Sequence, residues 1–224
     1  MERAYRNLGY VLIALLPIFI AGFWIPYLSE IPHFDESITA AVHAHAALLF
    51  CFLVLLIVQP LAIRYKALST HRILGKFSNI LIPFALLFSV AMLWKEYHEH
   101  LIDGATVDVA RNAEFLSAAQ LLLFGTLYGV AIASIRRRDV ATHMRCMICI
   151  ALVLLPAGLA RTLGYWFQIR QGSSQTVCMV LIDALLLALI VYDSRRRVAA
   201  RPYILVLVAY IVIEAVWITL GRPV

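Results

Sequence analysis

Seven long apolar stretches occupy most of this chain and limit the folds that it can adopt. They lie at about 8–28, 43–63, 73–94, 114–135, 146–168, 176–192 and 203–220. A helix needs about 20 apolar residues to cross the hydrocarbon core of a bilayer. The 224 residues are 63% hydrophobic and only 14% charged, and a soluble domain of that size cannot hide so much apolar surface. The sequence predicts an all-α, polytopic helix bundle with about seven transmembrane helices, in one domain over residues 1–224. Six helices with one re-entrant segment are the alternative.

Basic residues are concentrated in alternate loops of this bundle. Fourteen of the 19 Lys and Arg residues fall on one side, within the segments 3–6, 64–76, 136–145 and 195–201. Cytoplasmic loops carry such an excess, so we expect the N-terminus in the cytoplasm and the C-terminus outside it. The net charge of +6 therefore needs no nucleic acid. The arginine clusters also suit contacts with anionic lipid head groups, and a membrane-protein partner or a homo-oligomer stays open.

A short internal repeat relates the loops on this basic side. Arg64 precedes His71 by seven residues, Arg136 precedes His143 by seven, and Thr stands before each His. A third basic run, at 195–197, lacks the His. Because internal repeats are frequent in membrane folds, we predict helix 1 followed by three helical hairpins, 2–3, 4–5 and 6–7.

His71 and His143 are thereby predicted at the same cytoplasmic depth on different helices. Two facing histidines are one requirement for a haem with two axial imidazole ligands. The alternative is local: Thr70 and Thr142 would cap the N-termini of their helices, and each His would simply fall in the first turn.

Histidines also gather on the opposite side of the membrane. His43 and His45 open helix 2, His98 and His100 follow helix 3, and Glu114 stands at the start of helix 4. Imidazole and carboxylate ligands suit zinc, copper or iron. Residues i and i+2 of a helix point about 200° apart, so we expect one inward ligand from each pair, His45 and His98. The alternative is an ordinary polar interface.

Three ionisable residues, Arg161, Asp183 and Glu214, interrupt the apolar stretches. Such residues cost about 2.5–3.5 kcal/mol each at the centre of a span, and they pair or line functional cavities. At about 1.5 Å per residue, all three lie roughly 10 Å below the outer boundary. We expect Arg161 to pair with Asp183, because consecutive helices are usually neighbours, and the three to serve as catalytic or proton-relay groups. A purely structural interhelical clamp is the alternative.

The sequence also contains a set of short motifs, namely His43-x-His45, Gln59, His71-Arg72-x-Leu74-Gly75, Arg161, and Asp183 followed by Tyr192-Asp193. This set resembles uncharacterised bacterial multi-pass membrane proteins of the domain-of-unknown-function type. This resemblance implies the bacterial inner (plasma) membrane and no settled activity. The layout is also similar to cytochrome b561-type di-haem bundles, which implies haem b as a cofactor. In this chain helices 4, 6 and 7 contain no His, which leaves His71 with His143 and His45 with His98 as pairs.

Together these features predict an outward-facing polar, histidine-lined pocket. Its leading function is the binding of a transition metal or haem for redox or metal-dependent membrane chemistry. The alternatives are a proton-coupled small-solute carrier that uses Arg161, Asp183 and Glu214, or an accessory subunit of a membrane complex. The motifs G-x-S-x-G and H-E-x-x-H are absent from the sequence, so no motif names a substrate or a reaction.

Overall fold

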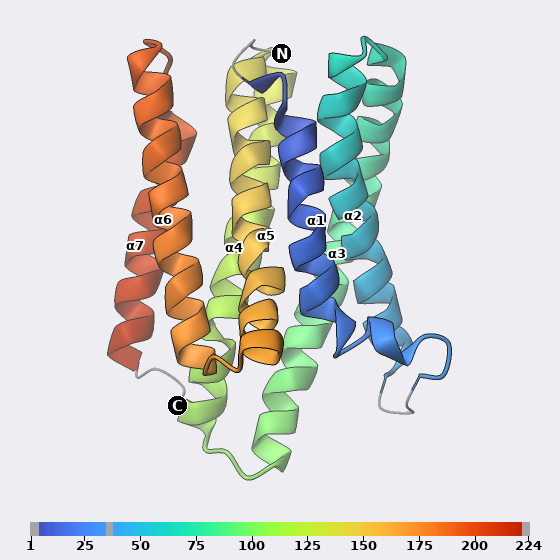
Figure 1. Cartoon of the computed structure of the whole chain (residues 1–224), viewed down its shortest axis with the longest axis vertical. Helices are drawn as coiled ribbons and strands as arrows, with labels where there is room; N and C mark the ends of the chain where they lie inside the picture. The colour runs from blue at the N-terminus through green and yellow to red at the C-terminus, as the bar shows by residue number, and fades with distance from the viewer. Residues whose placement is uncertain (1–4, 35–37, 221–224) are drawn as a thin grey trace.

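The computed structural model describes residues 5–34 and 38–220, and these residues form a bundle of seven α-helices (Figure 1). The helices are α1 (Leu8–Trp24), α2 (Ala40–Arg64), α3 (Leu68–Ile102), α4 (Val107–Arg136), α5 (Val140–Phe167), α6 (Gln171–Arg195) and α7 (Arg201–Leu220), with a short 3₁₀ turn, η2 (Leu28–Glu30), after α1. All seven lie roughly along the long axis of the molecule. The prediction of an all-α bundle is confirmed.

Six of these helices, α2 to α7, are long and apolar enough to cross a membrane, while α1 is shorter, at 17 residues. Their outward faces carry large apolar side chains that are mostly exposed, such as Phe50, Leu87, Leu122 and Leu205. A continuous apolar exterior of this kind is stable in lipid and not in water. The chain is therefore a multi-pass membrane protein.

Helix α5 is the centre of the bundle. In its most apolar window 56% of residues are buried, against 17–28% in the other five long helices. It contacts α1, α4, α6 and α7. Figure 1 shows α6 and α7 on one side of α5, and α1, α2 and α3 on the other. Two polar groups at the same depth on α5 can therefore face entirely different neighbours.

Three turns at one end of the bundle share one backbone conformation. Lys66, Arg138 and Arg197 each adopt the left-handed conformation, with φ of 62°, 62° and 57°. The N–H of the following residue donates to a carbonyl five residues back, over 2.8–3.0 Å. This is the Schellman arrangement that ends helices, usually with glycine in the left-handed position. Here cations occupy it, and a cation near a helix C-terminus is favoured by the helix dipole. We call the end of the bundle that contains these three turns the arginine-rich end.

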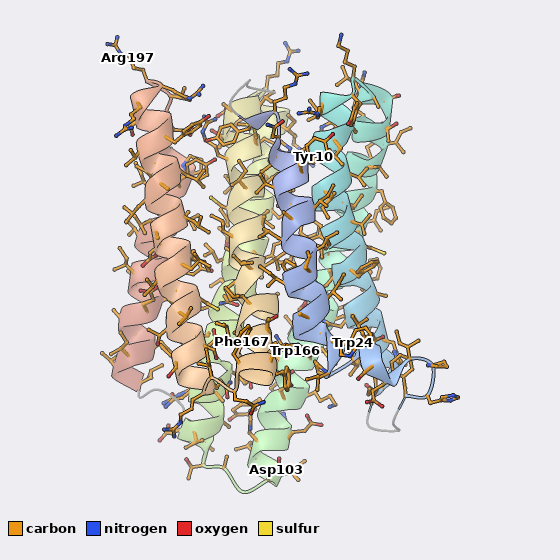
Figure 2. The ribbon with its side chains drawn as sticks, viewed as in Figure 1. Tyr10, Trp24, Asp103, Trp166, Phe167 and Arg197 are labelled. Carbon is orange, nitrogen blue, oxygen red and sulfur yellow. The ribbon has the colours of Figure 1, made fainter. Side chains whose placement is uncertain are left out.

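Helices α3 and α4 project beyond the other helices at the opposite end. They have 35 and 30 residues, about 52 and 45 Å at 1.5 Å per residue, against a hydrocarbon core of about 30 Å. In Figure 2, Asp103 at their turn lies well past the level of Trp24 and Trp166. The segment 95–113, which separates the apolar stretches 73–94 and 114–135, is therefore mostly helical. We call this the acidic end because it carries Glu96, Glu99, Asp103, Asp108 and Glu114.

Helix α1 is fixed to α5 by close backbone contact. A Cβ on Gly22 would lie 2.2 Å from the carbonyl oxygen of Gly158, so only glycine allows this approach. Thr162 Oγ1 and Trp166 Nε1 each donate to a backbone carbonyl of α1 over 2.9 Å. Small residues and interhelical hydrogen bonds are the usual means of helix association in lipid. The short first helix is thus an integral part of the bundle.

Candidate functional site

Asp183 on α6 and Glu214 on α7 bring two carboxyl groups together inside the bundle. The two helices pack against each other, and the two groups lie close enough to interact electrostatically. Asp183 Oδ1 and Glu214 Oε1 are buried, and neither has a hydrogen-bond partner in the described part of the chain. A buried polar atom without a partner costs free energy and calls for a functional explanation.

Tyr210 completes this group from one helical turn before Glu214 on the same face of α7. Its side chain is only 3% exposed. Its hydroxyl is buried and has no hydrogen-bond partner among residues 5–34 and 38–220. The hydroxyl oxygen lies within electrostatic range of both carboxyl groups. We call Asp183, Tyr210 and Glu214 the acid–tyrosine cluster.

Arg161 does not belong to this cluster, so the expected pairing of Arg161 with Asp183 is wrong. Its side chain is exposed, and Nη1 donates to the carbonyl of Ala157 on its own helix over 2.8 Å. The guanidinium lies 5.1 Å from the centre of the Phe23 ring on α1, and it interacts electrostatically with His45 on α2. Arg161 therefore faces the α1–α2 side of α5, away from α6 and α7.

The histidines of the acidic end are engaged separately. His43 Nδ1 lies 2.7 Å from the hydroxyl of Tyr27, and His45 Nδ1 lies 3.3 Å from Ser89 Oγ on α3. His98 Nδ1 lies 2.8 Å from a carbonyl of its own helix. As expected from their spacing, His43 and His45 point to different neighbours. His45 and His98, the two residues favoured as a pair of metal ligands, have different partners.

One contact joins two of the predicted ligands. His100 Nε2 lies 3.2 Å from Glu114 Oε1, and Glu96 lies close enough to Glu114 to interact with it electrostatically. Across residues 5–34 and 38–220, no group of three or more His, Cys, Asp or Glu side chains is arranged to hold a metal ion. A metal at the acidic end stays a prediction.

His71 and His143 lie near each other at the arginine-rich end, close enough to interact electrostatically. In the amide orientation that satisfies both of its ends, Gln59 donates to His71 Nδ1 and accepts from the N–H of Gly75 over 2.9 Å. His143 Nδ1 lies 3.0 Å from a carbonyl of α4. Through these contacts with His71 and Gly75, Gln59 links α2 to α3.

The alternative that Thr70 and Thr142 cap their helices is wrong, because α3 begins at residue 68 and α5 is capped by Asp139.

Arg145 and Asp193 form a buried ion pair that sequence reasoning missed. Arg145 Nε donates to Asp193 Oδ2 over 2.6 Å, and each side chain is 1% exposed. The Tyr5 hydroxyl donates to Asp193 Oδ1 over 2.7 Å, and the Tyr203 hydroxyl donates to Tyr5 over 3.3 Å. The network joins the N-terminal segment to α5, α6 and α7. A contact of this kind holds four separate parts of the chain against one another.

The sequence held a weak signal for this pair. Arg145 falls within the basic segment 136–145, and Asp193 stands two residues before the basic run at 195–197. Both residues lie inside their helices, however, since α5 begins at Val140 and α6 ends at Arg195. Arg145 lies more than one turn inside α5, whereas Asp193 lies in the last turn of α6, so position along the helix alone identifies only the first as a buried charge.

These features define a polytopic α-helical membrane protein with ionisable groups inside its spans. No known protein family, curated protein or solved structure matches the chain. Its function is therefore inferred from its own residues.

Proposed function

We propose that this protein is a proton-coupled carrier of a small solute, with the acid–tyrosine cluster as its proton site. The observation that carries the proposal is the pair of buried carboxyl oxygens, Asp183 Oδ1 and Glu214 Oε1, that lack hydrogen-bond partners in the described chain. Ionisable residues in transmembrane segments mark proton relays and ion pathways in pumps and transporters. A permanently charged structural pair would instead need a cation, and the cation expected there, Arg161, lies on the other side of α5.

Electrostatics limits the charge that this cluster can hold. Two carboxylates that share one site in a poorly solvated environment cannot both stay ionised, so at least one keeps a proton. The Tyr210 hydroxyl has no hydrogen-bond partner among the described residues, so its proton remains available as a donor beside the two carboxyl groups. Exposure of the cluster to water would favour release of the proton. Alternating exposure on the two sides of the membrane would then carry one proton per cycle.

Arg161 supplies a plausible chemistry for the solute. The guanidinium contacts a backbone carbonyl and an aromatic ring, and it has no carboxylate partner within the described residues. A guanidinium offers paired N–H donors to a carboxylate or another planar anion. We therefore infer that the solute carries an anionic group, and that a cotransported proton offsets its charge.

The proton site can be tested without knowledge of the solute. Infrared difference spectra between acidic and alkaline buffer should show the carbonyl stretch of a protonated carboxyl group in the wild-type protein. The band should disappear in the double variant Asp183→Asn/Glu214→Gln. It should persist in Asp108→Asn, a matched control at an acid that is 77% exposed. An unchanged band in the double variant would refute the proton site.

Transport is tested in proteoliposomes that contain a pH-sensitive dye. A panel of small carboxylates should include one whose addition drives proton uptake into wild-type vesicles. Asp183→Asn/Glu214→Gln should abolish that uptake, whereas Arg161→Gln should weaken solute affinity and leave the infrared band in place. Uptake that persists at the wild-type rate in the double variant would overturn the carrier proposal.

The proposal includes seven crossings with the N-terminus in the cytoplasm. At 17 residues, α1 is about 26 Å long, close to the thickness of the hydrocarbon core. It lies alongside α2 and α5 in Figure 1, and the arginine-rich end fits the cytoplasmic side. Single cysteines at Arg197 and Asp103 should react with a membrane-impermeant thiol reagent from opposite sides of the membrane. Labelling from the same side would exclude this topology.

A redox centre at His71 and His143 is the second candidate. It is favoured by the proximity of the two imidazoles and by the hydrogen bond that orients His71 through Gln59. These residues would hold a haem b or a transition metal through imidazole nitrogens. Visible spectra of the purified protein, oxidised and reduced, should show a strong Soret band if haem is bound. Metal analysis by mass spectrometry should find zinc, copper or iron if a non-haem centre is bound. The absence of both the Soret band and a bound metal would refute this candidate.

A further inference from the structure

A groove of about 450 Å³ runs along α3 and α4 at the arginine-rich end. Arg136 and Arg137 lie at its mouth, and Tyr128 lies about 13 Å deeper, at 1.5 Å per residue along α4. The remaining wall includes Asn79, Gly129 and Ile132. The groove therefore has a cationic mouth at the membrane boundary and a largely apolar interior within the span. Its volume lies in the range of ordinary ligand sites, about 300–1,000 Å³.

The polar atoms at the deep end are already bonded. The Tyr128 hydroxyl lies 2.9 Å from Ser78 Oγ and donates to Asn79 Oδ1 over 3.2 Å. Asn79 Nδ2 donates to the carbonyl of Gly75. A ligand in the groove thus meets satisfied polar groups in the interior. The free donors are concentrated at the mouth.

Arg136 and Arg137 are exposed, and neither side chain has an ion-pair or hydrogen-bond partner within the described chain. Gly129 forms an open part of the wall, since a Cβ added there would meet no atom within 4 Å. Two guanidinium groups without an ion-pair partner in the described chain lie at the mouth of a largely apolar groove. This arrangement is complementary to an amphiphile with an anionic head group and an aliphatic tail.

We propose that this groove binds one anionic phospholipid. Its phosphate contacts Arg136 and Arg137, and the first part of an acyl chain lies against Gly129 and Ile132. The groove opens within a span, so the surrounding bilayer delivers the lipid directly. Basic pockets between transmembrane helices bind phospholipid head groups by the same combination of charge and apolar surface. The site is separate from the acid–tyrosine cluster on α6 and α7, and it does not depend on the proposed function.

The test is native mass spectrometry of the purified full chain titrated with phosphatidylglycerol. Phosphatidylcholine with the same acyl chains serves as the net-neutral probe, and inorganic phosphate tests for binding of the anion alone. Arg136→Ala/Arg137→Ala removes the charge at the mouth, while Gly129→Leu fills the groove and leaves both arginines in place. Arg195→Ala/Arg197→Ala removes two exposed arginines from another turn of the same end and is the matched control.

Wild-type protein should prefer phosphatidylglycerol to phosphatidylcholine and should retain no inorganic phosphate. Arg136→Ala/Arg137→Ala should weaken phosphatidylglycerol binding about 30-fold, which corresponds to about 1 kcal/mol per arginine. Gly129→Leu should weaken binding of that lipid, and the control variant should bind as wild type does.

Three results would overturn the proposal. An equal loss in the control variant would mean general attraction to the cationic surface. Unchanged binding in Gly129→Leu would place the lipid outside the groove. A dimer that Gly129→Leu dissociates would show that a second copy of the chain fills the groove.

Discussion

Replacement of Asp193 by Asn should destabilise this bundle far more than loss of any exposed charge. The Asp193 carboxylate accepts from Arg145 Nε over 2.6 Å and from the Tyr5 hydroxyl over 2.7 Å, and both charged side chains are 1% exposed. Removal of one partner from a buried pair costs about 3–5 kcal/mol, because the remaining charge stays desolvated. We therefore expect Asp193→Asn to lower the free energy of unfolding by about 3–5 kcal/mol.

A matched control is the pair Asp108–Arg111, whose side chains are 77% and 60% exposed. Exposed pairs contribute about 0.2–1 kcal/mol, so Asp108→Asn should have little effect. The double variant Arg145→Met/Asp193→Leu should recover most of the loss, since apolar replacements of similar volume remove the desolvation cost. This recovery would separate the buried charge from the packing.

These differences in the free energy of unfolding are measured by reversible unfolding in mixed micelles. The fraction of a denaturing detergent is increased stepwise, and circular dichroism reports the loss of helix. The reasoning is refuted if Asp193→Asn loses no more stability than Asp108→Asn. It is refuted equally if the apolar double variant is less stable than the single variant, because packing rather than charge would then dominate.

Three further predictions concern local structure. Burial, and then a hydrogen bond to a carboxylate, raise the pKa of Tyr5 from 10.0 to about 12. The contribution of Tyr5 to the stability of the fold is therefore complete below pH 10 and is lost as the pH rises through about 12. Tyr5→Phe should remove that alkaline loss from a curve of stability against pH. Gly22→Ala should cost about 1–3 kcal/mol, since the new Cβ would lie 2.2 Å from the Gly158 carbonyl oxygen, whereas Gly129→Ala should have little effect in the same unfolding assay. Arg138→Gly should stabilise the α4–α5 turn by up to about 1 kcal/mol, because its left-handed φ of 62° strains any residue with a Cβ; an unchanged thermal midpoint would show that the cation at this position offsets the strain.

Much of the helix layout could be predicted from local sequence. The predicted stretch 203–220 agrees with α7 (Arg201–Leu220), and 43–63 agrees with α2 (Ala40–Arg64). The helix ends at Arg64 and Arg136 were also apparent, because the basic residues that follow an apolar run mark the boundary. The projection of α3 and α4 was less visible, since the polar segment 95–113 lacks the apolar pattern by which spans are found.

The aromatic residues illustrate the limit of such patterns. Trp24, Trp166 and Trp217 all lie near helix ends on the acidic side, where tryptophans commonly form an interfacial belt. Trp24 and Trp166 are exposed at one level in Figure 2, but Trp217 is 1% exposed and packs with Leu116 and Met179. Position along a helix gives the depth of a side chain but not its direction.

The sequence by itself determined the class of the protein, its helices and the approximate depth of its ionisable groups, because apolar length and basic boundaries are local properties of the chain. Only the tertiary structure decided which of these groups meet. Each residue along a helix turns the side chain by about 100°, and the packing of neighbours selects its partner. Arg161 therefore faces α1 and α2, Asp183 lies within electrostatic range of Glu214, and Asp193 is buried against Arg145.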